Sequence, residues 1–411
     1  MAKKSTKSKD AEAPNDAPAA EASSGDSVGN GKPVSASDVK SDVLRLPAEV
    51  RYADQLEALR QNDKDKPPVP WKLSPRSVLL YVVGGKTLPA VINGQEVEVP
   101  ITRKFFGDDS IVERSIVTLA SERALLLVGE PGTGKSWLSE HLAAAITGCS
   151  TLTIQGTAGT TEEHIKYSWN IARVIAEGPQ TSNLIPAPTM IAMRMGSLLR
   201  FEEITRCVPD VQDALVSILS DKAVAVPELP DANMVWAKPG FNVIATANSR
   251  DQGVNELSAA LKRRFNYVHI PIVGDQKTEM EIVRQRSSEL LKRYEIPVEL
   301  PPPIIKLLAT VFREIREGKT AEGVSVKQPS TTLSTAEAIA VALDSALHAR
   351  FFGQGSVTAN EVARNLTGSI VKEDAADLTA LKEYVTLVAK KRATSDPVWK
   401  DFYEAMTTVV R

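Results

Sequence analysis

The sequence predicts an α/β fold, a parallel five-stranded sheet with helices on both faces, followed by a small all-helical domain. Three observations lead to this prediction. Short apolar runs alternate with helical segments from about residue 101 to residue 272, as in βα units of a parallel sheet. The run 124–128 is wholly apolar, as expected of a strand buried on both faces. After about residue 273 the periodicity is helical throughout.

The individual elements follow from the same patterns. Strands are expected at 124–128, 152–155, 198–201, 243–247 and 267–270. Helices of the second domain are expected at 277–293, 302–317, 333–350 and 376–391. Asn93-Gly94, between two β-like runs, predicts a hairpin turn.

Composition divides the rest of the chain and excludes several classes of protein. Residues 1–41 are a low-complexity tail, expected to be disordered, and residues 42–100 form a mixed α/β extension interrupted by prolines. The net charge of −2 over 411 residues indicates no global basic surface for nucleic acid or membrane lipid. Two cysteines are too few for a disulfide framework, and no apolar run could cross a membrane. We therefore expect a cytoplasmic protein without a membrane anchor.

The most informative segment is a glycine-rich turn between the apolar run 124–128 and a helical stripe. Its spacing G-x-x-x-x-G-K-[ST] runs from Gly129 to Ser136. Backbone N–H groups of such a loop and the following helix N-terminus form a cradle for phosphate oxygens. Lys135 is expected to reach the β- and γ-phosphates and Ser136 to ligate Mg²⁺. The predicted nucleotide-binding residues are Gly129, Glu130, Pro131, Gly132, Thr133, Gly134, Lys135, Ser136 and Trp137.

Polar residues follow two of the other expected strands, those at 198–201 and 243–247. A hydrolytic site needs such residues to hold the metal and to orient the attacking water. Glu202 and Glu203 follow one apolar strand, with Glu202 placed to support Mg²⁺ and Glu203 to polarise the attacking water. Asn248 ends another strand and could bond the water or the γ-phosphate. Arg263 and Arg264 precede the last strand, where an arginine could project into a neighbouring subunit's nucleotide.

Together these four motifs, in this order, resemble a MoxR-type AAA+ ATPase of the dynein-related branch, over about residues 100–365. The resemblance implies Walker A at Lys135 and Ser136, Walker B at Glu202 and Glu203, and sensor 1 at Asn248. It implies an arginine finger at Arg264, with Arg263 as the rival, acting in trans in a ring, expected to be a hexamer. It also implies an AAA+ core at 101–272 with a hairpin-bearing insert at about 160–195. A lid at 273–368 and a C-terminal helical extension at 369–411 would follow.

Two departures from that pattern bear on the site. Walker B usually reads Asp-Glu, whereas this chain has Glu-Glu, so the carboxylate of Glu202 is displaced by one methylene. The lid arginine called sensor 2 should fall within 330–338, which contains no arginine, and Lys327 is one possible substitute.

Three functions remain open from sequence. The first is an ATP- and Mg²⁺-dependent ring ATPase that remodels or matures proteins, beside a von Willebrand A domain partner that the resemblance implies. The second is a nucleic-acid-directed motor or restriction-type subunit, which the near-neutral charge and the lack of an aromatic–basic cluster disfavour. The third is a module that binds nucleotide without turnover, against which Glu203 and Arg264 argue. ATP is preferred to GTP because the guanine-reading Asn-Lys-x-Asp does not occur in the chain.

Overall fold

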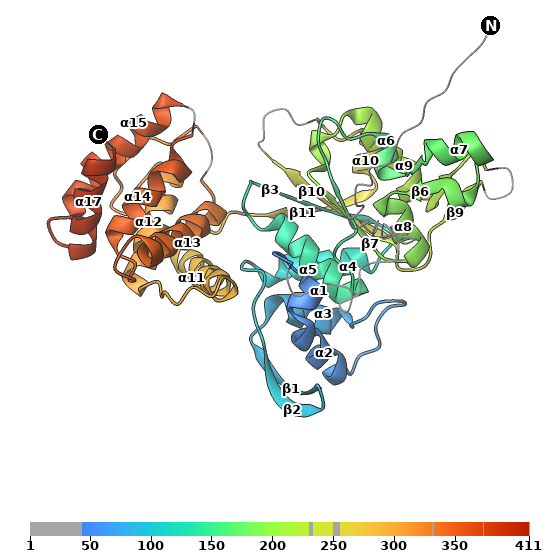
Figure 1. The fold of residues 1–411 in the computed structure, drawn as a ribbon, viewed down its shortest axis with the longest axis horizontal. Helices are drawn as coiled ribbons and strands as arrows, with labels where there is room; N and C mark the ends of the chain where they lie inside the picture. The colour runs from blue at the N-terminus through green and yellow to red at the C-terminus, as the bar shows by residue number, and fades with distance from the viewer. Residues whose placement is uncertain (1–42, 230–232, 250–254, 331–332, 373, 411) are drawn as a thin grey trace, which may run out of the picture. The chain divides into compact units, whose positions relative to one another are not determined.

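The computed structural model describes residues 43–229, 233–249, 255–330, 333–372 and 374–410 (Figure 1). The low-complexity tail expected at residues 1–41 lies outside the described residues.

The centre of the fold is a five-stranded sheet in the order β11-β3-β10-β7-β4. All of its neighbouring strands pair in parallel. The strands are β3 (Ala124–Gly129), β4 (Thr153–Gln155), β7 (Leu198–Glu202), β10 (Asn242–Asn248) and β11 (Phe265–Ile270). The predicted five-stranded parallel sheet is therefore confirmed, with strand ends within two residues of those expected.

Helices cover both faces of this sheet, which explains why its strands are apolar without alternation. Leu125 and Leu127 of β3 pack with one set of helices, and Ala124 and Leu126 with the other. The first set is α3 (Pro75–Val83), α4 (Asp109–Leu119) and α5 (Lys135–Thr147). The second set is α8 (Pro188–Met195), α9 (Pro209–Asp221) and α10 (Ala259–Lys262).

The N-terminal segment, which precedes α4, packs as a layer on the central sheet and has no separate hydrophobic core. It contains α1 (Ala48–Arg51), α2 (Ala53–Asn62), α3 and the antiparallel pair β1 (Lys86–Ile92) and β2 (Gln95–Ile101). The predicted hairpin turn is confirmed, since Asn93 and Gly94 have φ of 51° and 80°, as a type I′ turn requires. Leu59 and Tyr81 lie in the same hydrophobic cluster as Leu125.

The region of the expected insert contains short elements between β4 and β7. These are α6 (Glu162–Ile165), β5 (Tyr167–Trp169), α7 (Ile171–Glu177), η1 (Thr181–Asn183), β6 (Leu184–Pro186) and α8. Strands β5 and β6 pair antiparallel, with α7 between them in the chain. A further antiparallel pair, β8 (Ala223–Ala225) and β9 (Met234–Trp236), follows the turn η2 (Ile204–Arg206) and α9.

The remainder of the chain is helical, as the sequence predicts. It contains α11 (Gln276–Arg293), α12 (Pro302–Glu317), α13 (Thr335–Phe351), α14 (Ala359–Ile370), α15 (Ala375–Tyr384), the π-helical turn η3 (Val385–Ala389), α16 (Lys390–Arg392) and α17 (Pro397–Val409). One hydrophobic cluster extends from Val283 to Val410. The segments that the sequence divides at residue 368 thus share one core. Within the described ranges, no helix has the length and apolarity needed to span a bilayer.

Candidate active site

The phosphate loop joins β3 to α5, and two of its glycines adopt conformations that other residues rarely take. Gly132 and Gly134 have φ of 75° and 87°, and Gly134 is the N-cap from which α5 begins at Lys135. Gly129 is needed for close packing between strands, because a Cβ there would lie 2.5 Å from the carbonyl oxygen of Ile270 on the neighbouring strand. The loop is therefore shaped by backbone conformation at two positions and by close strand packing at a third.

Lys135 places its ammonium group inside this loop. Its side chain is buried, and Nζ donates to the carbonyl oxygens of Gly129 at 3.0 Å and Glu130 at 2.7 Å. The amine is thus held close to the loop's backbone, where a cation that neutralises bound phosphate is needed.

Ser136 and Glu202 meet directly, although 66 positions separate them in the chain. Glu202 is the last residue of β7 and is buried. Its Oε2 accepts from Ser136 Oγ at 2.7 Å and from Thr246 Oγ1 at 2.8 Å. Burial alone would raise the pKa of Glu202, but Arg200 and the three hydroxyls of Ser136, Ser139 and Thr246 hold the pKa below its usual value. An ionised carboxylate beside a hydroxyl is an oxygen donor set that fits Mg²⁺.

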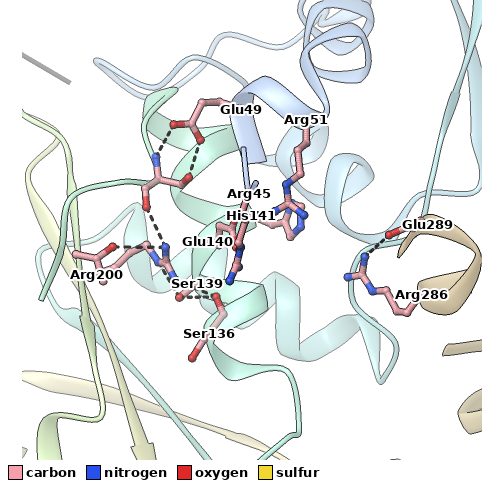
Figure 2. Close-up of polar contacts among 12 residues, drawn as sticks. Arg45, Glu49, Arg51, Ser136, Ser139, Glu140, His141, Arg200, Arg286 and Glu289 are labelled. Atoms are coloured by element: carbon pink, nitrogen blue, oxygen red, sulfur yellow. Dashed lines mark hydrogen bonds and ion pairs between the residues drawn. The ribbon is translucent and has the colours of Figure 1, made fainter. Parts of the chain in front are cut away.

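The other carboxylate oxygen of Glu202 has partners that the sequence analysis missed. Oε1 accepts from Ser139 Oγ at 2.7 Å and from Arg200 Nη2 at 2.8 Å. Figure 2 shows Arg200 directed toward Ser139 and Ser136 of α5. The available signal was a charged residue within the apolar strand 198–202, two positions before the acid and so on the same face of the strand.

Glu203 turns away from the strand in a left-handed conformation, with φ of 54°. Its N–H donates to Thr246 Oγ1 at 2.9 Å, and its carboxylate forms an ion pair with Arg206 Nε at 2.5 Å. Gly156 lies against this corner, with its N–H donating to the carbonyl oxygen of Glu202 at 2.7 Å. The side chain of Glu203 is one-third exposed, which leaves its carboxylate open to water.

Asn248 is brought beside the phosphate loop by strand register. It ends β10 directly opposite Gly129 of β3. The next residue, Ser249, donates its N–H to the carbonyl oxygen of Gly129 at 3.2 Å. The phosphate loop, the two glutamates and Asn248 therefore share the carboxyl edge of the sheet.

The two arginines before β11 lie at the opposite edge. Phe265 pairs with Ala124, the first residue of β3, whereas the phosphate loop follows its last residue. Arg264 donates from Nη1 to the carbonyl oxygen of Ala260 at 2.6 Å and from Nε to Ser220 Oγ. The side chain of Arg263 is exposed. Neither arginine belongs to the nucleotide site of its own chain.

A cavity of about 400 Å³ adjoins the phosphate loop. Apolar residues from several segments line part of it, among them Phe105, Phe106, Ile272, Val273 and Ile282. Cationic side chains line other parts: Arg45 and Arg51 come from the N-terminal layer, and Arg286, Arg293 and Arg316 from the helical domain. Sequence reasoning missed all five arginines, because none belongs to a local motif.

Trp137, predicted from its place in the loop segment, lines this cavity between two guanidinium groups. The guanidinium carbon of Arg286 lies 3.4 Å from the Trp137 ring centroid and that of Arg51 lies 4.8 Å from it. Arg51 is also paired with Glu140 of α5 at 2.6 Å, and Arg286 with Glu289 at 2.6 Å. Figure 2 shows Arg51 and Glu140, and the Arg286–Glu289 ion pair.

The lid cation that the resemblance implies is not supplied by Lys327. Lys327 Nζ pairs with Glu383 at 3.0 Å, and the cavity wall, as the described residues form it, does not include it. Arg316 does line the cavity, but its Nη1 and Nη2 are bonded to the buried carboxylate of Glu279 at 3.0 and 2.9 Å. The positive charge of Arg316 is therefore neutralised by Glu279.

A glycine-rich phosphate loop, paired acidic residues and a polar strand end at one edge of a parallel sheet define a P-loop nucleoside-triphosphate-binding protein. Residues 124–265 match the AAA domain of the dynein-related subfamily, and residues 277–410 match the YehL-like AAA+ ATPase C-terminal domain. The uncharacterized protein YehL of Escherichia coli K12 is 42% identical over 366 residues, which cover 88% of this chain and 96% of YehL. The chain belongs to the YehL-like family of AAA+ ATPases.

Other similarities are weaker. The uncharacterized protein SH1500 of Staphylococcus haemolyticus is 25% identical over 180 residues, covering 44% of this chain and 67% of that protein. Among solved structures, NtrX from Brucella abortus in complex with ATP aligns with a TM-score of 0.44 and 12% identity, over 75% of this chain and 70% of NtrX.

Proposed function

We propose that this protein hydrolyses ATP with Mg²⁺ and that a ring of its subunits uses the reaction to remodel or mature other proteins. The observation that carries the catalytic part is the 2.7 Å contact between Ser136 Oγ and Glu202 Oε2. It joins the phosphate loop to the acidic strand end, with Glu203 next in the chain and Asn248 on the adjacent strand.

Each residue then has a distinct role. Lys135 and the loop N–H groups neutralise the phosphates, and Ser136 with Glu202 would hold Mg²⁺, which would supply charge stabilisation at the transferred phosphoryl group. Glu203, partly exposed, orients and deprotonates the attacking water. Asn248 would hydrogen-bond that water or the γ-phosphate. We expect ATP to be the substrate.

Replacing Glu203 by Gln tests the base. The amide keeps the shape but accepts a proton poorly, so we expect ATP binding to persist and turnover to fall by about 10²–10⁴-fold. Phosphate release and binding of a fluorescent ATP analogue measure the two effects separately. Glu202→Gln should mainly weaken the Mg²⁺ dependence.

Glu281→Gln is a matched control, because Glu281 forms an i,i+3 ion pair with Arg284 at 2.5 Å, as Glu203 does with Arg206. That control should hydrolyse ATP normally. If Glu203→Gln turned over at the wild-type rate, Glu203 would not be the base. If the Glu202 and Glu203 phenotypes were exchanged, the metal and base roles would be reversed.

We further propose that Arg264, with Arg263 as the alternative, acts on the nucleotide of a neighbouring subunit. The support is its position at the edge of the sheet opposite its own phosphate loop. Arg264→Ala should bind ATP almost normally and lose most turnover, since a finger in trans is worth about 10³–10⁵ in rate in well-studied systems.

Mixing subunits tests this directly. Arg264→Ala supplies an intact pocket and Lys135→Ala an intact finger, so mixed rings should regain part of the activity. No recovery in assemblies shown by light scattering to be mixed would exclude Arg264 as the trans residue, and the same experiment with Arg263→Ala then tests the alternative.

The remodelling role and a von Willebrand A domain partner follow from the resemblance to MoxR-type proteins. A pull-down with Glu203→Gln, which should hold bound ATP, followed by mass spectrometry tests for a protein client. Stimulation of hydrolysis by DNA or RNA at low salt would instead favour a nucleic-acid motor.

A further inference from the structure

The carboxylate of Glu202 uses its two oxygens for different contacts. Oε2 faces the hydroxyls of Ser136 and Thr246, at 2.7 and 2.8 Å. Oε1 faces away from this pair and is held by Ser139 Oγ and Arg200 Nη2, at 2.7 and 2.8 Å. One oxygen is therefore anchored, and the other is presented to the residue expected to ligate the metal.

Arg200 connects this anchor to two other segments. Its Nε donates to Ser139 Oγ at 3.0 Å, and its Nη2 also lies 3.1 Å from the carbonyl oxygen of Ser136. Its Nη1 donates to the carbonyl oxygen of Ser150, 2.9 Å away, in the segment that leads into β4. The side chain is only 11% exposed. A planar guanidinium with five donors can make all these bonds in one geometry.

We propose that Arg200 is a positioning residue for the magnesium site, which fixes Glu202 so that Oε2 points at Ser136. This inference depends on the proposed Mg²⁺-dependent function.

The arrangement is compatible with a metal ion. A serine hydroxyl has one hydrogen and two lone pairs, so Ser136 can keep donating to Oε2 while a lone pair binds Mg²⁺. Glu202 then acts by orienting the Ser136 hydroxyl and the waters of the ion, which usually retains several of them.

Two effects of Arg200 oppose each other. Its charge repels a divalent cation, whereas its hydrogen bonds orient the carboxylate. The repulsion is largely cancelled because the Arg200–Glu202 pair has no net charge. Removing partners that orient metal ligands typically costs about 10–100-fold in metal affinity. We therefore expect the loss of Arg200 to lower the affinity for Mg²⁺, because losing the orientation of Glu202 costs more than removing the repulsion between Arg200 and the ion gains.

The test measures binding, independently of hydrolysis. The affinity for a fluorescent ATP analogue is determined in EDTA and over a Mg²⁺ titration, for wild type, Arg200→Met, Arg200→Lys and Ser139→Ala. Arg200→Met should bind nucleotide in EDTA as wild type does, but need about 10-fold or more Mg²⁺ for the same tightening. Arg200→Lys should show most of the same loss, since one ammonium cannot replace the guanidinium bonds to Ser139, Glu202 and two carbonyls. Ser139→Ala, which leaves Arg200 in place, should show a smaller loss in the same direction.

Arg392→Met provides the matched control. Arg392 is also a largely buried arginine in ion pairs, with Glu314 and Glu322 in the helical domain, and it does not line the nucleotide cavity. That variant should lower the thermal midpoint without changing the Mg²⁺ titration.

The possible outcomes separate the two proposals. Unchanged or increased Mg²⁺ affinity in Arg200→Met, equal weakening in EDTA, or full rescue by Arg200→Lys would each overturn a positioning role. If Arg200→Met fails to fold, Arg200→Lys and Ser139→Ala decide, and wild-type titrations in both would reject the role. A wild-type protein that binds Mg²⁺–nucleotide but does not hydrolyse it would refute the proposed ATPase function and leave this comparison intact.

Discussion

Gly156 lies where an added methyl group would disturb Glu203 without removing any polar group. A Cβ at Gly156 would lie 3.0 Å from the carbonyl oxygen of Glu202 and from the carbonyl carbon of Glu203, and still closer to the carbonyl oxygen of Glu203. The φ of Gly156 is outside the left-handed region, so alanine can adopt the backbone conformation. Gly156→Ala is therefore a purely steric perturbation of the backbone that carries the proposed base.

The size of the effect follows from contact distances. Non-bonded carbon atoms normally lie about 3.5–4.0 Å apart, so the Glu203 carbonyl must move by more than about 0.5 Å. A misplacement of about 1 Å can cost about 10²-fold in rate. We expect kcat to fall by about 10–100-fold, with a loss of about 1–3 kcal/mol in the free energy of unfolding from overpacking.

Steady-state phosphate release at saturating ATP and Mg²⁺ measures kcat, and nucleotide affinity should change little because the phosphate loop is not touched. Gly159→Ala is the control: it lies in the same loop, and the nearest atom to its added Cβ is Thr157 Oγ1 at 3.9 Å. A folded Gly156→Ala protein with wild-type kcat would refute the reasoning. So would an equal loss in Gly159→Ala.

Two further predictions follow. Lys135→Ala should abolish nucleotide binding, whereas Lys327→Ala should not, because Lys327 is paired outside the cavity; micromolar affinity in Lys135→Ala would show that the loop does not bind the phosphates. Burial lowers the pKa of Lys104 to about 7, from about 10.4 in an unfolded chain. The unfolded state therefore binds more protons between these values, and stability should rise with pH from about 7 toward 10 by at most about 1.4 kcal/mol per pH unit. Denaturant unfolding across this range should show a flatter dependence for Lys104→Met, and an equal slope in that variant would exclude Lys104 as the cause.

Local patterns predicted the sheet well, because a strand buried on both faces and a glycine-rich turn have distinctive sequences. The same reasoning placed Glu202 and Asn248 on strand ends, and parallel register then brought both to one edge. Arg200 and Thr246 were missed since their roles depend on which strands become neighbours. Thr246 reads in sequence as a small residue in an apolar strand, yet it is bonded to both Glu202 and Glu203.

The arginines that line the cavity could not be predicted from local sequence patterns either. The segment 330–338 contains no arginine. The arginines that line the cavity come from other helices and from the N-terminal layer. Arg51, for example, reaches the cavity through its pairing with Glu140 of α5, 89 positions away. Contacts between residues so far apart in the chain produce no periodic pattern in the sequence from which they could be predicted.

The shared core of the N-terminal layer has a practical consequence for dissecting the protein. A fragment beginning at residue 101 would keep every sequence motif, yet it would lose Leu59, Tyr81 and Val82. These residues are almost wholly buried in the hydrophobic cluster on one face of the sheet. Such a fragment would expose a continuous apolar surface, which commonly leads to aggregation. It would also lose Arg45 and Arg51 from the cavity beside the phosphate loop. A fragment that keeps this layer and both of these arginines must therefore begin at or before Arg45, well upstream of the first sequence motif.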